Sequence, residues 1–263
     1  PLDYFLATTA SLGSPVCNVA TRHQLRPISA LWGKRPLMNR FAAMIAVSEA
    51  VRDGLLAAGF PARQVVAVLN GIPAAGPGDP PASLRRELGL DSACGPVVGY
   101  VGRLSREKEP ELLLEAAALL GGRWPGLQIV LIGGDGGNDQ RTRQLRELGR
   151  SLGLSVRICG YRPDAARLMP AFDLLAVTSR AEPFGLVSVE ALARGVPVVA
   201  TRSGGSREII RHGREGLLVA PGDVRALAAA ITRLLGEPGL HARCARAGPL
   251  RVARRFTLER QVA

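Results

Sequence analysis

Short apolar segments alternate with longer amphipathic ones over most of this 263-residue chain, and this alternation restricts the fold more than any other feature. Strands alternating with helices of about 10 to 15 residues are typical of βαβ units, whose strands pair in parallel. We therefore predict an α/β protein with a doubly wound parallel sheet and right-handed crossovers. Beyond residue 96, the predicted strands are 97–101, 128–132, 156–159, 174–177, 198–200 and 217–219. The predicted helices are 107–120, 139–152, 165–171, 186–194, 206–211 and 224–235, followed by a helical stretch at 240–256.

A run rich in Pro and Gly, residues 73–81, indicates a linker between two parts of the chain. Before the linker we expect a loosely helical start, strands at 16–20, 42–47 and 65–69, and helices at 37–41 and 49–58, the latter with Ser48 as its N-cap. The predicted organisation is a partial N-terminal lobe (1–72), a linker (73–90), a complete C-terminal domain (91–238) and a C-terminal helical segment (239–263).

The formal net charge of +12 at pH 7 raises the question of an anionic partner. Only Lys34 and Lys108 are lysines, and the arginines are dispersed, without the interleaved aromatic residues that stack on nucleic-acid bases. We therefore expect no nucleic-acid partner, and leave open a peripheral contact with an anionic membrane surface.

No window has the roughly 18 to 20 unbroken apolar residues of a spanning helix. No signal-peptide pattern is evident. A cytoplasmic protein, with that peripheral contact to the inner face of the membrane, is the expectation.

The cysteines indicate neither a disulfide framework nor a zinc site, because Cys17, Cys94, Cys159 and Cys244 are far apart and form no C-x-x-C pair. A D-x-D metal motif is not evident either. We expect no metal and no other cofactor.

The segment 174–200 carries the densest set of candidate functional residues. Glu182 and Glu190 are separated by seven residues, and a helix is predicted to begin at Phe184-Gly185-Leu186 between them. The unpaired N–H groups and positive dipole end of a helix N-terminus suit a phosphate. A carboxylate further along the same helix can bond a sugar hydroxyl. This arrangement indicates a nucleotide-sugar site.

Other candidate residues lie where ligands bind in open parallel sheets, beyond the carboxyl ends of strands. Arg103 and Lys108 follow the strand 97–101, and such a pair either clamps a diphosphate or belongs to a solvated basic loop. The glycine loop at 133–137 departs from the dinucleotide fingerprint, and the loop containing Arg162 is a candidate base pocket formed by backbone groups. His23 lies beyond the carboxyl end of the first predicted strand, although a lone histidine is more often structural.

Several motifs occur together and in one order: VGRLxxEK at 101–108, EPFGLVxxEA at 182–191, GVPVV at 195–199, GGxxEI at 204–209 and GLLVxPGD at 216–223. In combination they closely resemble glycosyltransferase family 4, whose members are retaining enzymes of the GT-B fold with two Rossmann-like lobes. The strong resemblance covers about residues 97–235, and a weaker one covers 21–23, 70–72 and 256–258.

The resemblance implies a role for each matching residue. Arg103 and Lys108 would neutralise the diphosphate of a UDP- or GDP-sugar donor, with backbone N–H groups at Gly185 and Leu186. Glu190 would hold the ribose, and Glu182 and Phe184 would lie beside the transferred sugar. His23 would contact that sugar or the acceptor, which would be a glycan, a lipid-linked sugar or a small molecule. The reaction would transfer a hexose with retention, without a metal.

The sequence also departs from the family pattern. Pro73 stands where the family usually has Asp, and Arg207 where Pro is common. The family's first lobe normally starts with additional βα units, so we expect this chain to be a fragment that turns over poorly. The alternatives are a sugar phosphorylase or nucleotide-sugar epimerase of the same fold, and a non-catalytic nucleotide-binding module.

Overall fold

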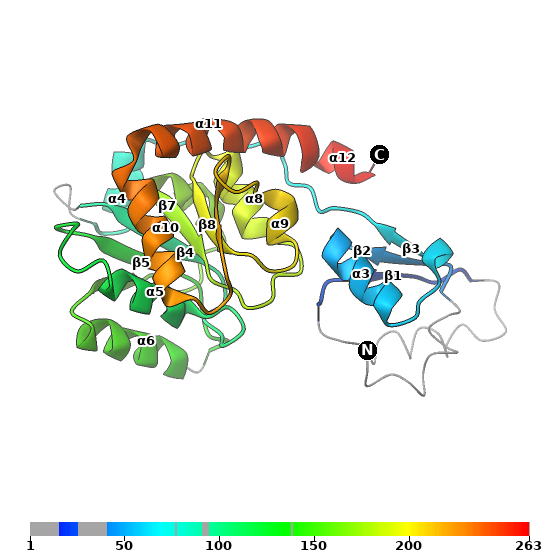
Figure 1. Cartoon of the computed structure of the whole chain (residues 1–263), viewed down its shortest axis with the longest axis horizontal. Coiled ribbons are helices and arrows are strands. Elements are labelled where there is room, and N and C mark those ends of the chain that lie inside the picture. The colour runs from blue at the N-terminus through cyan, green and yellow to red at the C-terminus, as the bar shows by residue number, and fades with distance from the viewer. Residues whose placement is uncertain (1–15, 26–40, 77, 91–94, 138, 263) are drawn as a thin grey trace.

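The computed structural model describes residues 16–25, 41–76, 78–90, 95–137 and 139–262, which form two parallel β-sheets with helices around them (Figure 1). The small sheet has the strand order β1-β2-β3, and the large sheet has the order β6-β5-β4-β7-β8-β9. The predicted doubly wound parallel architecture is therefore confirmed. The loosely helical start, Cys94 and nearly all of the helix predicted at 37–41 lie outside the described residues.

The small sheet consists of β1 (Val19–Arg22), β2 (Ala43–Ala46) and β3 (Val65–Ala67), with α3 (Glu49–Ala57) between β2 and β3. Alternate strand residues are buried in one core with Val51 and Leu55 of α3. Ser48 caps α3 as predicted, because its Oγ accepts a hydrogen bond from Val51 N at 3.1 Å. Strand β1 lies a few residues later than predicted, so that it ends immediately before His23.

The large sheet is the framework of the C-terminal domain. Its strands are β4 (Val97–Val101), β5 (Gln128–Ile132), β6 (Ser155–Ile158), β7 (Leu174–Val177), β8 (Val198–Thr201) and β9 (Gly216–Val219). Its connecting helices are α5 (Pro110–Ala118), α6 (Gln140–Ser151), α7 (Ala165–Leu168) with the 3₁₀ turn η3 (Met169–Ala171), α8 (Leu186–Ala193), α9 (Ser206–Ile209) and α10 (Val224–Gly236). Strands β7, β8 and β9 are buried throughout, as expected of parallel strands covered on both faces.

The strand order reverses between β4 and β7. From β4 the chain adds β5 and β6 on one side, and then returns to add β7, β8 and β9 on the other. Helices α5, α6 and α10 contribute to one hydrophobic cluster, and α8 and α9 contribute to a second cluster that continues into the small lobe. Such a topological switch point leaves a crevice at the carboxyl ends of the strands.

Helix α4 (Pro81–Glu87) lies in the predicted linker and was not predicted, whereas α12 (Leu258–Val262) falls within the predicted C-terminal helical segment. Proline suits the first position of α4, where no N–H bond is lost. The long helix α11 (Pro238–Arg255) runs along the large domain to α12 (Figure 1). Just beyond α11, Phe256 O accepts a hydrogen bond from Ile72 N at 2.9 Å.

Among the described residues, no helix is both long and apolar enough to cross a bilayer.

Gly99 allows β4 to lie directly against Phe172. A Cβ atom at this position would lie 2.0 Å from the Phe172 ring. We expect Gly99→Ala to lower the free energy of unfolding by about 1–3 kcal/mol, because the ring or the strand must shift. Denaturant titration measures this loss. Gly239→Ala in α11 is the control, because a Cβ there meets nothing within 4 Å. Equal effects of the two substitutions would contradict the prediction.

Candidate functional site

A cavity of about 630 Å³ lies at the carboxyl ends of β1, β4 and β7, with residues from both lobes in its wall. We call it the first cavity. The small lobe contributes His23, Gln24, Leu25, Val47 and Asn70. The large domain contributes the loops after β4 and β7 and the start of α8, including Arg103, Lys108, Glu182, Phe184, Gly185 and Leu186. The structure thus brings together every predicted site residue except Glu190 and Arg162.

Lys108 and Glu182 form an ion pair in the first cavity, with Nζ and Oε2 2.6 Å apart. Ser179 Oγ donates to the same carboxylate oxygen at 2.9 Å. Thr178 Oγ1 donates to the carbonyl of Lys108 at 2.7 Å and so anchors the lysine backbone. Because Glu182 is only 8% exposed, solvent screens this pair weakly. The amine is therefore held in place beside an acid that an anionic ligand would have to displace.

Arg103 has a different environment from Lys108. Its side chain is 72% exposed, and its Nη2 lies 3.9 Å from Glu107 Oε2. Its backbone is fixed, because the hydroxyl of buried Tyr100 donates to Arg103 O at 2.8 Å. Burial, with the nearby negative charge of Glu182, raises the pKa of that tyrosine. Arg103 therefore presents a solvated guanidinium from an anchored backbone.

The start of α8 forms another part of the wall. Gly185 precedes the helix with φ of 112°, a conformation that residues with a Cβ rarely adopt. Its carbonyl accepts hydrogen bonds from Ser188 N and Val189 N. Leu186 and Val187, the first two helical residues, line the first cavity. The positive end of the helix dipole thus lies at this cavity.

Phe184 lines the cavity, but its ring belongs to the core. The side chain is 3% exposed and packs edge-on against Phe256, with ring centroids 5.9 Å apart. The Glu182–Phe184 loop also contacts a glycine pair before α9. A Cβ on Gly204 would lie 2.1 Å from Glu182 O, and one on Gly205 would lie 2.4 Å from Phe184 O. Only glycines allow the two loops to pack this closely.

Glu190 lies outside the walls of the first cavity and of the second cavity described below. It is half-buried on α8, four residues after Leu186, so the two residues share one face of the helix. Burial raises the pKa of its carboxyl group, while the positive charge of Arg194 acts in the opposite direction. Its predicted contact with a ribose stays a prediction.

A second cavity of about 850 Å³ adjoins the first and shares Val101, Gly102 and Arg103 with it. Glycine loops after β5 and β6 line it, and they are connected by a hydrogen bond from Gly133 N to Gly160 O at 2.8 Å. Asp135, exposed Tyr161 and Arg162 also line this cavity.

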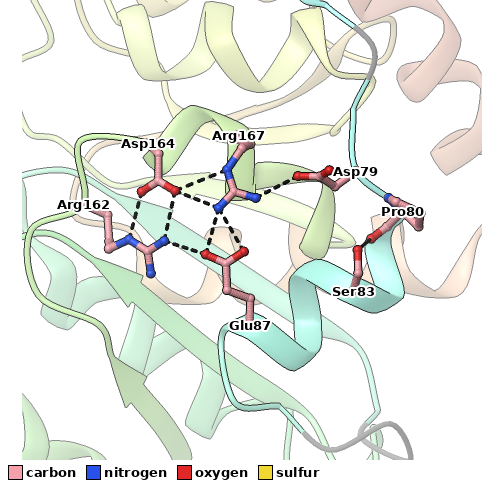
Figure 2. Close-up of polar contacts among 7 residues, drawn as sticks. All are labelled: Asp79, Pro80, Ser83, Glu87, Arg162, Asp164 and Arg167. Carbon is pink, nitrogen blue, oxygen red and sulfur yellow. Dashed lines mark hydrogen bonds and ion pairs between the residues drawn. The ribbon is translucent and has the colours of Figure 1, made fainter.

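The guanidinium of Arg162 belongs to an ion-pair network with acids from two segments. It donates to Asp164 at 2.8 Å and to Glu87 of α4 at 2.6 Å, and Arg167 bonds the same two acids (Figure 2). Arg167 also reaches Asp79 before α4 at 2.7 Å. The side chain of Arg162 therefore holds the loop against the linker. Its predicted contribution to ligand binding through backbone groups stays a prediction.

His23 is exposed and lies in the wall of the first cavity, immediately after β1. Its expected position at a strand end is therefore correct. The predicted site residues did not include Tyr100, Thr178 or Ser179, which anchor Arg103, Lys108 and Glu182, respectively. Thr178 and Ser179 follow β7 directly, so the strand-end rule that selected His23 would also have selected them.

Among the residues that the structure describes, no group of three or more His, Cys, Asp or Glu side chains could hold a metal ion.

The raised pKa of Glu190 gives a prediction for stability. Because the folded state holds this proton more tightly than the unfolded state does, stability falls as pH rises from near 4.5 through the folded pKa. Glu190→Gln carries no charge to bury, so we expect it to unfold at higher urea concentration than the wild type at pH 7. The difference should shrink at about pH 4. Exposed Glu147→Gln is the control and should change little. A destabilised Glu190→Gln at pH 7 would contradict this account.

The sequence of this chain matches a known protein family and several curated proteins. The model of the family described as glycosyl transferases group 1 matches residues 91–251. The D-inositol 3-phosphate glycosyltransferase of Corynebacterium urealyticum is 40% identical over 177 residues, or 65% of this chain and 42% of that protein. The protein of the same name from Rhodococcus jostii is 41% identical over 190 residues, or 70% of this chain and 41% of that protein. The matched stretch thus spans about two fifths of these curated relatives.

Solved structures have the same architecture. Alr3699/HepE of Anabaena, in complex with UDP and glucose, is 32% identical with a TM-score of 0.88, covering 98% of this chain and 72% of that one. Sucrose-phosphate synthase of Thermosynechococcus elongatus is 26% identical with a TM-score of 0.86, covering 99% of this chain and 69% of that one. With a family match over more than half of its residues and a GT-B fold, the chain belongs to the group 1 glycosyl transferases.

Proposed function

We propose that this chain binds a nucleotide diphosphate sugar across its two cavities and forms the donor side of a retaining hexosyltransferase. The observation that carries the proposal is the convergence of Arg103, Lys108 and the start of α8 on one cavity, with His23 opposite on the other lobe. Two cations and a helix N-terminus match the charge of a diphosphate.

The diphosphate is the leaving group in this reaction, and its departure leaves positive charge on the sugar ring. Lys108 would exchange Glu182 for a phosphate oxygen, which brings the amine to the leaving group and releases the carboxylate beside the sugar. The solvated guanidinium of Arg103 can turn to the same phosphates. Preorganised charges of this kind commonly contribute the largest share of catalysis. The departing phosphate would then take the proton of the acceptor hydroxyl, which attacks from the same face.

The nucleoside would occupy the second cavity. Its glycine loops expose backbone groups, and the side chain of Arg162 is committed to Asp164 and Glu87. A base would therefore be recognised mainly by main-chain contacts. The binding of UDP by Anabaena Alr3699/HepE supports uridine as the first nucleotide to test. Glu190 would bond the ribose, which would join the base in the second cavity to the diphosphate in the first.

The acceptor side comprises His23, Gln24 and Asn70 of the small lobe. These polar side chains suit a polyol, and the names of the relatives support inositol 3-phosphate as the first acceptor to test. A peripheral membrane contact, a cytoplasmic location and the absence of a cofactor stay predictions.

Removal of either cation tests the diphosphate assignment. We expect UDP to bind the wild type, and Arg103→Ala and Lys108→Ala each to weaken binding about tenfold to a hundredfold, as for a lost hydrogen bond between charged groups. Isothermal titration calorimetry measures the dissociation constants. Arg106 is exposed in the same loop but lies outside the wall of the first cavity, so Arg106→Ala is the control and should bind UDP with wild-type affinity. Wild-type affinity in both cation variants would refute the assignment.

The products made from UDP-glucose distinguish transfer from its alternatives. We expect a glucoside of the acceptor with retained anomeric configuration, identified by NMR. Glucose 1-phosphate formed with inorganic phosphate would indicate a phosphorylase, and UDP-galactose an epimerase. A chain that binds UDP but forms no donor-dependent product with any acceptor would be a nucleotide-binding module.

A further inference from the structure

Glu208, part of the GGxxEI motif, connects the two lobes and lies outside the walls of both cavities. Its two carboxylate oxygens accept hydrogen bonds from Glu49 N and Ala50 N, each at 3.0 Å. These are the first two residues of α3 in the small lobe, whose N–H groups have no partner within the helix. A carboxylate at a helix N-terminus also interacts favourably with the helix dipole. The short helix α9 of the large domain thus caps α3 across the interface.

A second contact crosses the interface at the same place. Ser48, the N-cap of α3, donates from its Oγ to Pro183 O at 2.6 Å. Pro183 lies between Glu182 and Phe184 in the wall of the first cavity. The N-terminus of α3 is therefore bonded to α9 and to the loop that carries Glu182.

The large domain holds Glu208 in a fixed position. Gly205 N donates to Glu182 O at 2.9 Å, so α9 starts against the same loop. Arg251 of α11 donates to the carbonyls of Glu208 and Ile209 at 2.5 and 2.7 Å. Its guanidinium lies 5.8 Å from the centre of the Phe256 ring, which packs on Phe184. The backbone of α9, which carries Glu208, is thus held at both ends.

Helix α3 is connected through β2 to strand β1, which ends immediately before His23. Strand β1 pairs with β2 along its whole length, and Ser48 starts α3 two residues after β2 ends. A rotation of α3 would therefore move the small sheet and His23 relative to Glu182. Two more hydrogen bonds join the end of the small lobe to the C-terminal segment: Ile72 N donates to Phe256 O, and Gly71 N donates to Gln261 Oε1. Neither bond involves α3 or α9.

We propose that Glu208 is a positioning residue that sets the orientation of the two lobes and keeps His23 opposite the Glu182–Phe184 loop. It acts through α3 and touches neither donor nor acceptor. Its effect on turnover rests on the proposed function, whereas its effect on the lobes does not.

Four measurements on the whole chain test this proposal, with Glu208→Ala as the main variant. Hydrogen exchange of the peptide containing Glu49 and Ala50 should accelerate at least tenfold, because both amides lose their acceptor. The radius of gyration from small-angle X-ray scattering should increase. UDP affinity should stay within twofold of the wild type, while the kcat for transfer from UDP-glucose falls at least tenfold with little change in donor KM.

Two further variants separate positioning from general damage. Glu208→Gln keeps the shape and one acceptor oxygen, so its exchange rate and kcat should lie between those of the wild type and Glu208→Ala. Arg207→Ala, at an exposed neighbouring position of α9, should match the wild type in all measurements.

Unchanged exchange and scattering in Glu208→Ala would overturn the proposal, and so would loosened lobes with an unchanged kcat. A wild-type chain that does not bind UDP would instead refute the proposed function, and exchange and scattering would still decide the role of Glu208.

Discussion

The site depends on backbone segments that lie closer together than side chains permit. A Cβ on Gly133 would lie 1.8 Å from Gly102 O, which would push apart the loops after β4 and β5. Gly204 and Gly205 play the same part between α9 and the Glu182–Phe184 loop. These contacts bring loops from separate strands to one edge of the sheet. They explain why glycines recur in this chain after strands and before helices, where ligands bind in parallel α/β folds.

Close packing of the loops also strengthens the interaction between charged side chains at the site, because it limits their access to water. Lys108 and Glu182 pair where water has little access, and the loss of either partner would leave a charge with poor solvation. A diphosphate is a suitable replacement for Glu182, since it brings its own negative charge to Lys108. The pair therefore keeps the amine ordered before a ligand arrives. Arg103 needs no such partner, because its guanidinium remains in water until it is used.

Much of this structure could be predicted, because burial in a parallel sheet produces apolar runs with clear ends. The bounds predicted for β4, β5 and β7 agree with the structure, and the strand-end positions of His23, Arg103 and Lys108 follow from the same pattern. Helix α4 escaped prediction because its start lies in a run of prolines and glycines, where proline is acceptable only in the first turn. The ring of Phe184 lies in the core because Phe256, 72 residues later, offers it an aromatic partner, and no local pattern contains that contact.

Contacts between segments far apart in sequence also explain how the chain uses its many arginines. Arg162 and Arg167 join the linker to a cavity loop through Glu87, and Arg251 fixes α9 through two carbonyl groups. A guanidinium suits these tasks because it keeps its charge when half-buried and donates several bonds in one plane. Net charge is therefore a poor guide to the partners of this protein. The cations at the proposed donor site are few, and their position at one edge of the sheet, rather than their number, gives them a function.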